Sequence, residues 1–203
     1  MKIFAADIIA FHDTRLATPQ SGNALPVQFA DSSSAWHWLE ANHRNNSWLW
    51  DEEDLARRRH VADSEIAQNK RHIDGFNQQR NDAVERIDDL LLQTLTPKLN
   101  PAARLHSETP GMMIDRLSIL ALKINAMRAQ TVRTDADAVH LATCAEKLAR
   151  LNDQRRDLAD CLDTLLADCA AGHARYKIYR QYKMYNDPTL NPQLYADNEK
   201  NKR

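Results

Sequence analysis

The sequence predicts an all-α fold, an antiparallel helical bundle with three long helices, short N-terminal helices and an irregular C-terminal tail. Its 203 residues include only 4 glycines and 7 prolines, and 27% are charged. This composition favours helices over sheets. Apolar residues recur at spacings of three and four along several stretches, the period of one helix face. No strand-like alternation is longer than a few residues, and the length suits one domain over 1–203.

The first 60 residues are expected to hold short helices and a loop. A helix is expected over 4–16 and a loop over 17–33. A second helix should follow this loop and end at the polar stretch HRNNS. A third should begin with Asp51 as its N-cap, supported by Asp54 three positions later, and run to the end of this region.

The three long helices are expected over 62–96, 110–130 and 135–171. Thr109 as N-cap and Pro110 as the first helical residue predict where the second of them starts. This second helix is apolar nearly all round. A helix of that kind is buried nearly all round, so it should lie at the centre of the bundle.

A last helix is expected over 173–186, where tyrosines recur every three residues between arginines and lysines. An irregular tail over 187–203 should follow. Tyrosines beside cations suit a sugar ring with an anionic group, or a stacked base. The alternative is that the tyrosines pack on the bundle and that Asn and Asp simply stop the helix. The candidate ligand-binding residues here are Lys183, Tyr185, Asn186 and Asp187.

Charge and hydropathy limit the function classes. The net charge is -1 and the pI is about 6.7, which argues against a nucleic-acid partner. The mean hydropathy is -0.63, so no membrane span is expected. Asp7 interrupts the apolar start and no clear cleavage site follows, which favours a cytoplasmic protein. The three cysteines show no CxxC or zinc spacing, so no metal site is expected.

The unusual feature is a polar stripe on the inward face of the helix over 62–96. Stepping by 3.6 residues from Ile66 places these polar side chains on the same face as apolar ones. Polar groups that face a core cost free energy unless they are paired. The stripe therefore indicates either a binding site or a structural salt-bridge network. Its members are Lys70, Asp74, Asn77, Arg80, Asn81 and Asp88.

The helix expected over 110–130 adds charged residues at the same height in the bundle as the polar stripe. Arg116 and Lys123 are seven residues apart and share one face, and Asp115 lies beside them. Antiparallel packing would bring Lys123 opposite about Ala83, so one polar pocket in mid-bundle is expected. Cations beside asparagine amides suit a phosphate or carboxylate. Paired or snorkelling side chains are the alternative.

Other chemistries have weaker support. Glu85 and Asp88 could hold Mg²⁺ against a pyrophosphate, as in all-α nucleotide pyrophosphohydrolases, and no cofactor is expected otherwise. Glu40 and His43 have one spacing found in di-iron bundles, but the other ligands are missing. With so few glycines and no G-x-G-x-x-G, glycine-rich nucleotide loops are nearly excluded.

Four segments together resemble the bacterial domain-of-unknown-function family 4254. They are NSWLWDEEDLAR (46–57), 70–88, ETPGMMIDRLSILALK (108–123) and KMYNDPTLNP (183–192). The run DRLSIL is also similar to small proteins that accompany glycosyltransferases. The resemblance implies a role near lipopolysaccharide or other surface-glycan synthesis. It implies no established activity and no catalytic residues.

Three functional hypotheses remain. The first is an accessory protein of glycan synthesis that binds an anionic, sugar-related ligand in the mid-bundle pocket. The second is an interaction module that docks on a glycosyltransferase, or on a second copy of the chain, through four tryptophans. The third is an Mg²⁺-dependent nucleotide or sugar-nucleotide phosphohydrolase. The tryptophans are Trp36, Trp38, Trp48 and Trp50.

Overall fold

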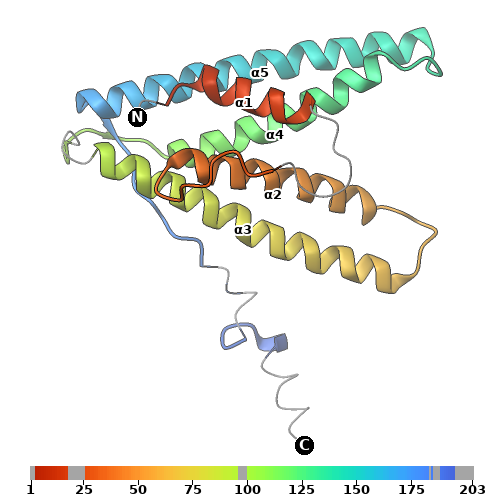
Figure 1. Cartoon of the computed structure of the whole chain (residues 1–203), viewed down its shortest axis with the longest axis horizontal. Helices are drawn as coiled ribbons and strands as arrows, with labels where there is room; N and C mark the ends of the chain where they lie inside the picture. The colour runs from red at the N-terminus through yellow and green to blue at the C-terminus, as the bar shows by residue number, and fades with distance from the viewer. Residues whose placement is uncertain (1–2, 18–25, 96–99, 183, 185–187, 195–203) are drawn as a thin grey trace, which may run out of the picture.

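Two antiparallel helical hairpins form the body of the protein in the computed structural model, which describes residues 3–17, 26–95, 100–182, 184 and 188–194 (Figure 1). The first pairs α2 (Ala35–Leu55) with α3 (Asp63–Leu95), and the second pairs α4 (Pro110–Thr131) with α5 (Ala138–Ala171). Helix α1 (Ala5–Ala17) packs across α4 and α5. The predicted all-α helical bundle is confirmed.

Figure 1 shows that the hairpins lie close together at one end of the molecule and diverge toward the other. The turns within both hairpins lie at this diverging end. Helix α4 is central, because it packs against α1, α2, α3 and α5. This agrees with its predicted burial. The α4 side chains exposed by 2% or less include Met113, Ile114, Leu117 and Ile124.

Local sequence signals explain several helix ends. The Thr109 side chain accepts a hydrogen bond from the Met112 backbone N–H, and Pro110 starts α4 as predicted. The Asp137 side chain accepts one from His140 N–H and caps α5. Gly172 adopts φ 75° at the end of α5, a left-handed conformation that glycine tolerates without steric cost.

The predicted break at HRNNS is wrong, because α2 is one continuous helix of 21 residues. The body therefore contains a fourth long helix, and Asp51 lies inside it rather than at an N-cap. Its polar side chains turn inward and find partners there. His43 and Asn46 contact α4, and the Asn45 amide donates to the Ala41 carbonyl. Because these polar side chains have hydrogen-bond partners inside the fold, they do not interrupt the helix.

The predicted helix over 173–186 is wrong for its described residues up to 182, which are not helical. Strand β2 (Ala174–Arg175) pairs in parallel with β1 (Arg104–Leu105), and the chain then runs extended. Tertiary contacts override the tyrosine spacing, because the Arg180 guanidinium pairs with Glu85 and Asp89 of α3. We call residues 174–181 the C-terminal strap. Within the strap Tyr176 is buried and Tyr179 is exposed, and Tyr182, just after the strap, is exposed as well.

None of the helices in the described part of the chain is long and apolar enough to cross a membrane.

Candidate functional site

A buried ion pair at the junction of α2, α3 and α4 organises the candidate site. The Asp115 carboxylate of α4 is buried, with 5% exposure. Arg80 of α3 donates to both of its oxygens, with Nε 2.8 Å from Oδ1 and Nη2 2.5 Å from Oδ2. Asn42 and Asn46 of α2 donate to the same Oδ1 at 2.8 and 2.9 Å. Three helices thus converge on one carboxylate.

The hydrogen-bonded network continues inward from Asn46 to a pair of histidines. The Asn46 amide donates to the Ser118 hydroxyl at 3.1 Å, and that hydroxyl lies 2.8 Å from His43 Nδ1. The His43 ring stacks on the His12 ring of α1, with centroids 4.4 Å apart. Both nitrogens of His12 and Nε2 of His43 are buried and have no hydrogen-bond partner among the described residues. We call these groups, from Arg80 to His12, the polar network.

Burial decides the charge state of the two histidines. Desolvation lowers the pKa of His43 from 6.5 to about 4, with a smaller contribution from Arg15. It lowers the pKa of His12 well below its ordinary value, and His43 and Arg155 add to the effect. Both rings are therefore neutral near pH 7.

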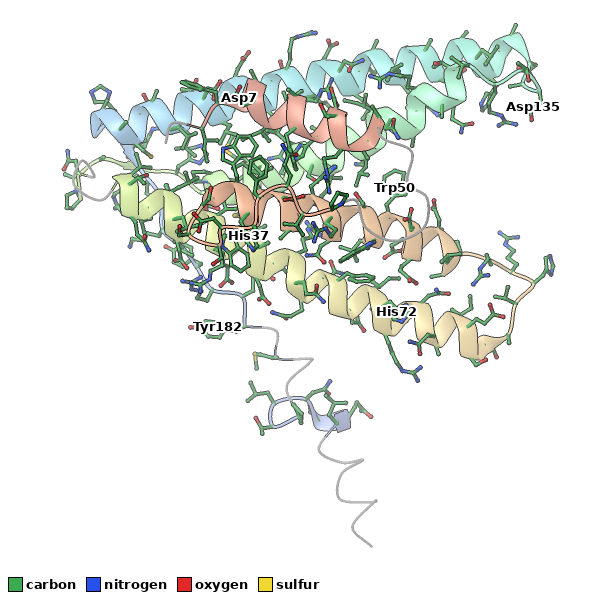
Figure 2. The ribbon with its side chains drawn as sticks, in the orientation of Figure 1. Asp7, His37, Trp50, His72, Asp135 and Tyr182 are labelled. Atoms are coloured by element: carbon green, nitrogen blue, oxygen red, sulfur yellow. The ribbon has the colours of Figure 1, made fainter. Side chains whose placement is uncertain are left out.

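The outer end of the polar network opens into a groove of about 350 Å³ between α2, α3 and α4. Apolar side chains and the Trp50 ring lie beside charged and amide groups in its lining. We call it the polar groove. It is lined by Asn46, Leu49, Trp50, Glu53, Asp54, Arg57, Asn77, Arg80, Ile119 and Leu122. Figure 2 shows Trp50 extending from α2 toward α4.

Arg80 is a fixed cation at the wall of this groove. Its hydrogen bonds to Asp115 raise the pKa of its guanidinium, so it stays charged. Among the described residues, the only hydrogen-bond partner of its Nη1 atom is the Asn77 side-chain oxygen at 3.5 Å, a distance too long for a strong hydrogen bond. The second cation, Arg57, pairs with Glu53 one helical turn away at 3.1 Å. This arrangement suits recognition of an anionic group together with neutral polar groups.

Acid–base or nucleophilic chemistry has no accessible centre in the polar network. Ser118 and His43 have the hydrogen-bonded contact of a nucleophile and its base. However, Ser118 has 0% exposure and His43 has 3%, so an external substrate cannot reach the hydroxyl.

Comparison with known proteins places the chain in a family. The family model described as "Protein of unknown function (DUF4254)" matches residues 36–178. The chain belongs to this family. A search of the curated proteins and a search of the solved structures gave no significant match.

Three of the four segments named from the sequence meet around the polar groove of this DUF4254 protein. The segment 46–57 includes the C-terminal part of α2, the segment 70–88 lies within α3, and the segment 108–123 includes the first part of α4. In the fourth segment, Lys183, Tyr185, Asn186 and Asp187 lie outside the described residues.

The structure brings some predicted site residues together and separates others. Asn77 and Arg80 line the polar groove, and Asp115 lies behind Arg80. Asn81 is half-buried and is not part of the groove lining. Lys123 is exposed and lines a neighbouring groove.

Lys70, Asp74 and Arg116 form exposed ion pairs away from the polar groove of the DUF4254 protein. Lys70 pairs with Asp74 one turn along α3, and Arg116 pairs with Glu108 at 2.7 Å. These pairs are typical surface salt bridges, which contribute about 0–1 kcal/mol each.

Asp88 has a structural role at the start of α4. Its carboxylate accepts a hydrogen bond of 2.7 Å from the Gly111 backbone N–H and another from the Thr109 side chain. It is 2% exposed, and burial raises its pKa from 3.8 to about 6. Glu85, its proposed metal-binding partner, holds Arg180 and the Gln181 N–H of the strap. Both carboxylates of the suggested Mg²⁺ pair are therefore engaged in the fold.

Glu40 and His43 are also engaged. The Glu40 carboxylate accepts from the backbone N–H groups of Gln28 and Phe29 at 2.8–2.9 Å. No group of three or more His, Cys, Asp or Glu residues suited to a metal ion occurs in the described part of the chain.

Sequence reasoning missed the contribution of α2. Asn42, His43 and Asn46 are all buried in the DUF4254 protein, but their polarity suggested a helix break. The available signal was their spacing, because positions three and four apart share one helix face. Trp50 and Asp54 follow on the same helix, and Arg57 lies just after its end.

Proposed function

We propose that the polar groove binds a sugar-related ligand carrying a phosphate or carboxylate, and that the protein is an accessory of surface-glycan synthesis. The observation that carries the proposal is the immobilised Arg80. Its carboxylate partner is itself held by Asn42 and Asn46. A cation fixed in this way loses little conformational entropy when it binds an anion.

Stability alone does not account for the network. Burying an ion pair costs desolvation free energy, and well-packed apolar residues are often as stable in its place. In the Asp115–Arg80 pair, the carboxylate also accepts hydrogen bonds from two asparagine amides, and the arginine lines a groove. Preorganised polar groups beside an open groove are expected at a binding site.

The groove lining matches the chemistry of a sugar. Trp50 and Leu122 offer apolar surface to the C–H face of a ring. Asn77, Glu53 and Asp54 can exchange hydrogen bonds with hydroxyls. Arg57 and Arg80 would contact the anionic group. The volume of about 350 Å³ lies at the small end of ligand pockets, which run from about 300 to 1,000 Å³.

The link to glycan synthesis rests on the sequence resemblance described above. Three of the segments that carry this resemblance line the polar groove, which supports looking for the ligand there.

Calorimetric titration tests the proposal with glucose 1-phosphate, glucuronate, glucose and inorganic phosphate. We expect the two anionic sugars to bind more tightly than glucose or phosphate alone. Arg57→Ala should weaken glucose 1-phosphate binding about tenfold, equivalent to about 1.4 kcal/mol. This variant should fold normally because the Arg57 side chain is 67% exposed.

Arg116→Ala is the matched control, since Arg116 also forms an exposed ion pair. It should bind as the wild type does. Absence of binding by both anionic sugars at millimolar concentration, or equal losses in both variants, would contradict the proposal.

A protein-interaction role is the second candidate, through a surface other than the tryptophans. All four tryptophans are half-buried, and Trp36 packs on Phe11 and Phe29. Several exposed large apolar side chains lie instead in the C-terminal part of the described chain, at Tyr179, Tyr182, Met184, Leu190 and Leu194. If this role is correct, Tyr179→Ser with Tyr182→Ser should abolish co-purification of a partner and leave sugar binding unchanged.

A further inference from the structure

A second groove adjoins the polar groove and shares Trp50 with it. It has a volume of about 440 Å³ and lies between α4 and α5. Leu122 lines the polar groove and the next residue, Lys123, lines this one. We call it the basic groove. It is lined by Trp50, Lys123, Ala126, Met127, Gln130, Lys147, Arg150, Leu151 and Gln154.

We propose that the two grooves hold one two-part ligand, a nucleoside diphosphate sugar, with the sugar in the polar groove and the nucleotide in the basic groove. This inference rests on the proposed function, because it assigns the sugar to the same groove. It adds a second subsite and the class of group bound there.

Charge separates the two grooves. The basic groove has three cations in its lining and no carboxylate among the described lining residues. Arg150 pairs with Glu146, which lies outside that lining. Lys123 and Lys147 form no ion pair within the described part of the chain. By contrast, Glu53 and Asp54 offset the two arginines of the polar groove. The stronger anion therefore belongs in the basic groove.

The remaining lining suits a nucleobase. Trp50, Met127 and Leu151 offer apolar surface on which a flat ring can stack. Gln130 and Gln154 carry amides, which can donate to and accept from the edge of a base. A lipid chain would gain nothing from these two amides, so the lining favours a nucleotide over a prenyl phosphate. Side chains rather than a glycine-rich loop would hold the phosphates.

The position of Trp50 explains how one ligand can occupy both grooves. Figure 2 places Trp50 between α2 and α4, on the inner side of the diverging hairpins. A diphosphate passing this ring would have Lys123 on one side and Arg57 with Arg80 on the other. Linking two weak binding groups makes the second contact intramolecular, so the whole ligand should bind more tightly than either part.

Calorimetric titrations with the sugar phosphate, the nucleoside diphosphates and the complete nucleoside diphosphate sugars test the inference. The probes are glucose 1-phosphate, UDP, ADP, GDP, CDP, their glucose conjugates, and dodecyl phosphate as a lipid-like anion. We expect at least one glucose conjugate to bind at least tenfold more tightly than its nucleoside diphosphate or glucose 1-phosphate.

Two variants separate the grooves. Lys147→Ala should weaken the nucleoside diphosphate and its glucose conjugate about tenfold and leave glucose 1-phosphate unchanged. Arg57→Ala should weaken glucose 1-phosphate and the conjugate about tenfold, and it should weaken the free nucleoside diphosphate less than Lys147→Ala does. Arg156→Ala is the control on α5, because it also removes an exposed ion-paired arginine and lies outside both grooves. It should change none of these affinities.

The outcomes distinguish this inference from the proposed function. If glucose 1-phosphate binds through Arg57 but no nucleoside diphosphate binds, the basic groove is not a nucleotide subsite and the proposed function stands. If dodecyl phosphate binds through Lys147 and the nucleotides do not, the inference is wrong as well. If nucleoside diphosphates bind through Lys147 but no sugar binds through Arg57, the two-part ligand and the proposed function are both overturned.

Discussion

Two buried aspartates on neighbouring helices have opposite surroundings. Asp115 accepts hydrogen bonds from Arg80, Asn42 and Asn46, and its arginine partner reaches a groove. Asp88 has no cation among its hydrogen-bond partners in the described part of the chain, and it accepts from the Gly111 N–H at the start of α4. Both are at most 5% exposed. Burial of a carboxylate alone therefore does not identify a binding site, whereas the nature and position of its partners do.

Removal of Asp115 and removal of Asp88 should therefore affect the protein differently. Removing Asp115 leaves a charged guanidinium without its partner. Removing Asp88 leaves only backbone and hydroxyl donors without an acceptor.

The largest effect is expected for Asp115→Ala. It should lower the free energy of unfolding by about 3–5 kcal/mol, because the variant strands Arg80 and two buried amides. Urea denaturation monitored by circular dichroism measures the loss. The double variant Arg80→Met, Asp115→Leu should recover part of it, since both charges are then gone. If the double variant is less stable than Asp115→Ala, the pair is not the source of the loss.

The close approach between α3 and α4 near Asp88 gives the second prediction. A Cβ atom on Gly111 would lie 2.6 Å from the Val84 carbonyl oxygen and 2.9 Å from Asp88 Oδ1. Gly111→Ala should therefore lower the free energy of unfolding by about 2–3 kcal/mol through overpacking.

Gly75→Ala is the matched control in α3. Apart from its chain neighbours and the backbone of its own helix, no heavy atom of the described residues lies within 4 Å of the corresponding Cβ position, and alanine favours helix by about 1 kcal/mol over glycine. This variant should raise the midpoint of urea denaturation. A loss from Gly75→Ala, or no loss from Gly111→Ala, would contradict the packing.

Sequence periodicity predicted the parts of the fold that depend on local rules. Asp63–Leu95 and Pro110–Thr131 agree with the expected helices to within one residue at each end, because caps and prolines act locally. Where polar residues suggest a helix end but tertiary contacts satisfy them, prediction from the sequence fails. Asn42 and Asn46 continue a helix because Asp115, about 70 positions away, satisfies them.

The candidate site could be predicted only in part for the same reason. Asn77 and Arg80 were identifiable as inward-facing polar residues of one helix. The structure shows that Asp88, on the same stripe, caps a neighbouring helix instead. Which polar residue meets a groove depends on the helix that packs opposite, and periodicity within one segment does not contain that information.

The polar network and Asp88 should respond to acid in opposite directions. His43 has a pKa of about 4 in the fold and 6.5 unfolded, and the pKa of His12 is lowered as well. Between pH 6.5 and 4 the unfolded chain binds more protons at these sites, so stability falls as pH falls. The slope is at most about 1.4 kcal/mol per pH unit for each histidine.

The variant His12→Leu tests the histidine contribution to this acid-induced loss of stability, because leucine fills the buried space without a titrating group. Urea midpoints at pH 7.5, 6.5, 5.5 and 4.5 should show a smaller acid loss than for the wild type. At pH 7.5 the variant should be at least as stable, since both ring nitrogens of His12 lack partners. An unchanged pH profile would show that His12 does not contribute.

The smallest change at neutral pH is expected for Asp88→Asn. Asparagine retains an acceptor for the Gly111 N–H and carries no charge to desolvate, so stability at pH 7.5 should change by no more than about 1 kcal/mol. The pKa of Asp88 is about 6 in the fold. Wild-type stability therefore gains from its protonation as pH falls from 6 toward 3.8. The variant lacks this gain, and its urea midpoint should decline more steeply below pH 6 than that of the wild type.

The C-terminal strap has a consequence for the order of folding. Its Arg180 meets Glu85 across 95 positions of the chain, and Arg175 meets the Ala103 carbonyl across 72. Contacts of such long range carry a large loop-closure entropy until the helices between them have formed. The strap should therefore dock after both hairpins are in place. Weakening it by Arg180→Ala should speed unfolding while leaving the refolding rate almost unchanged.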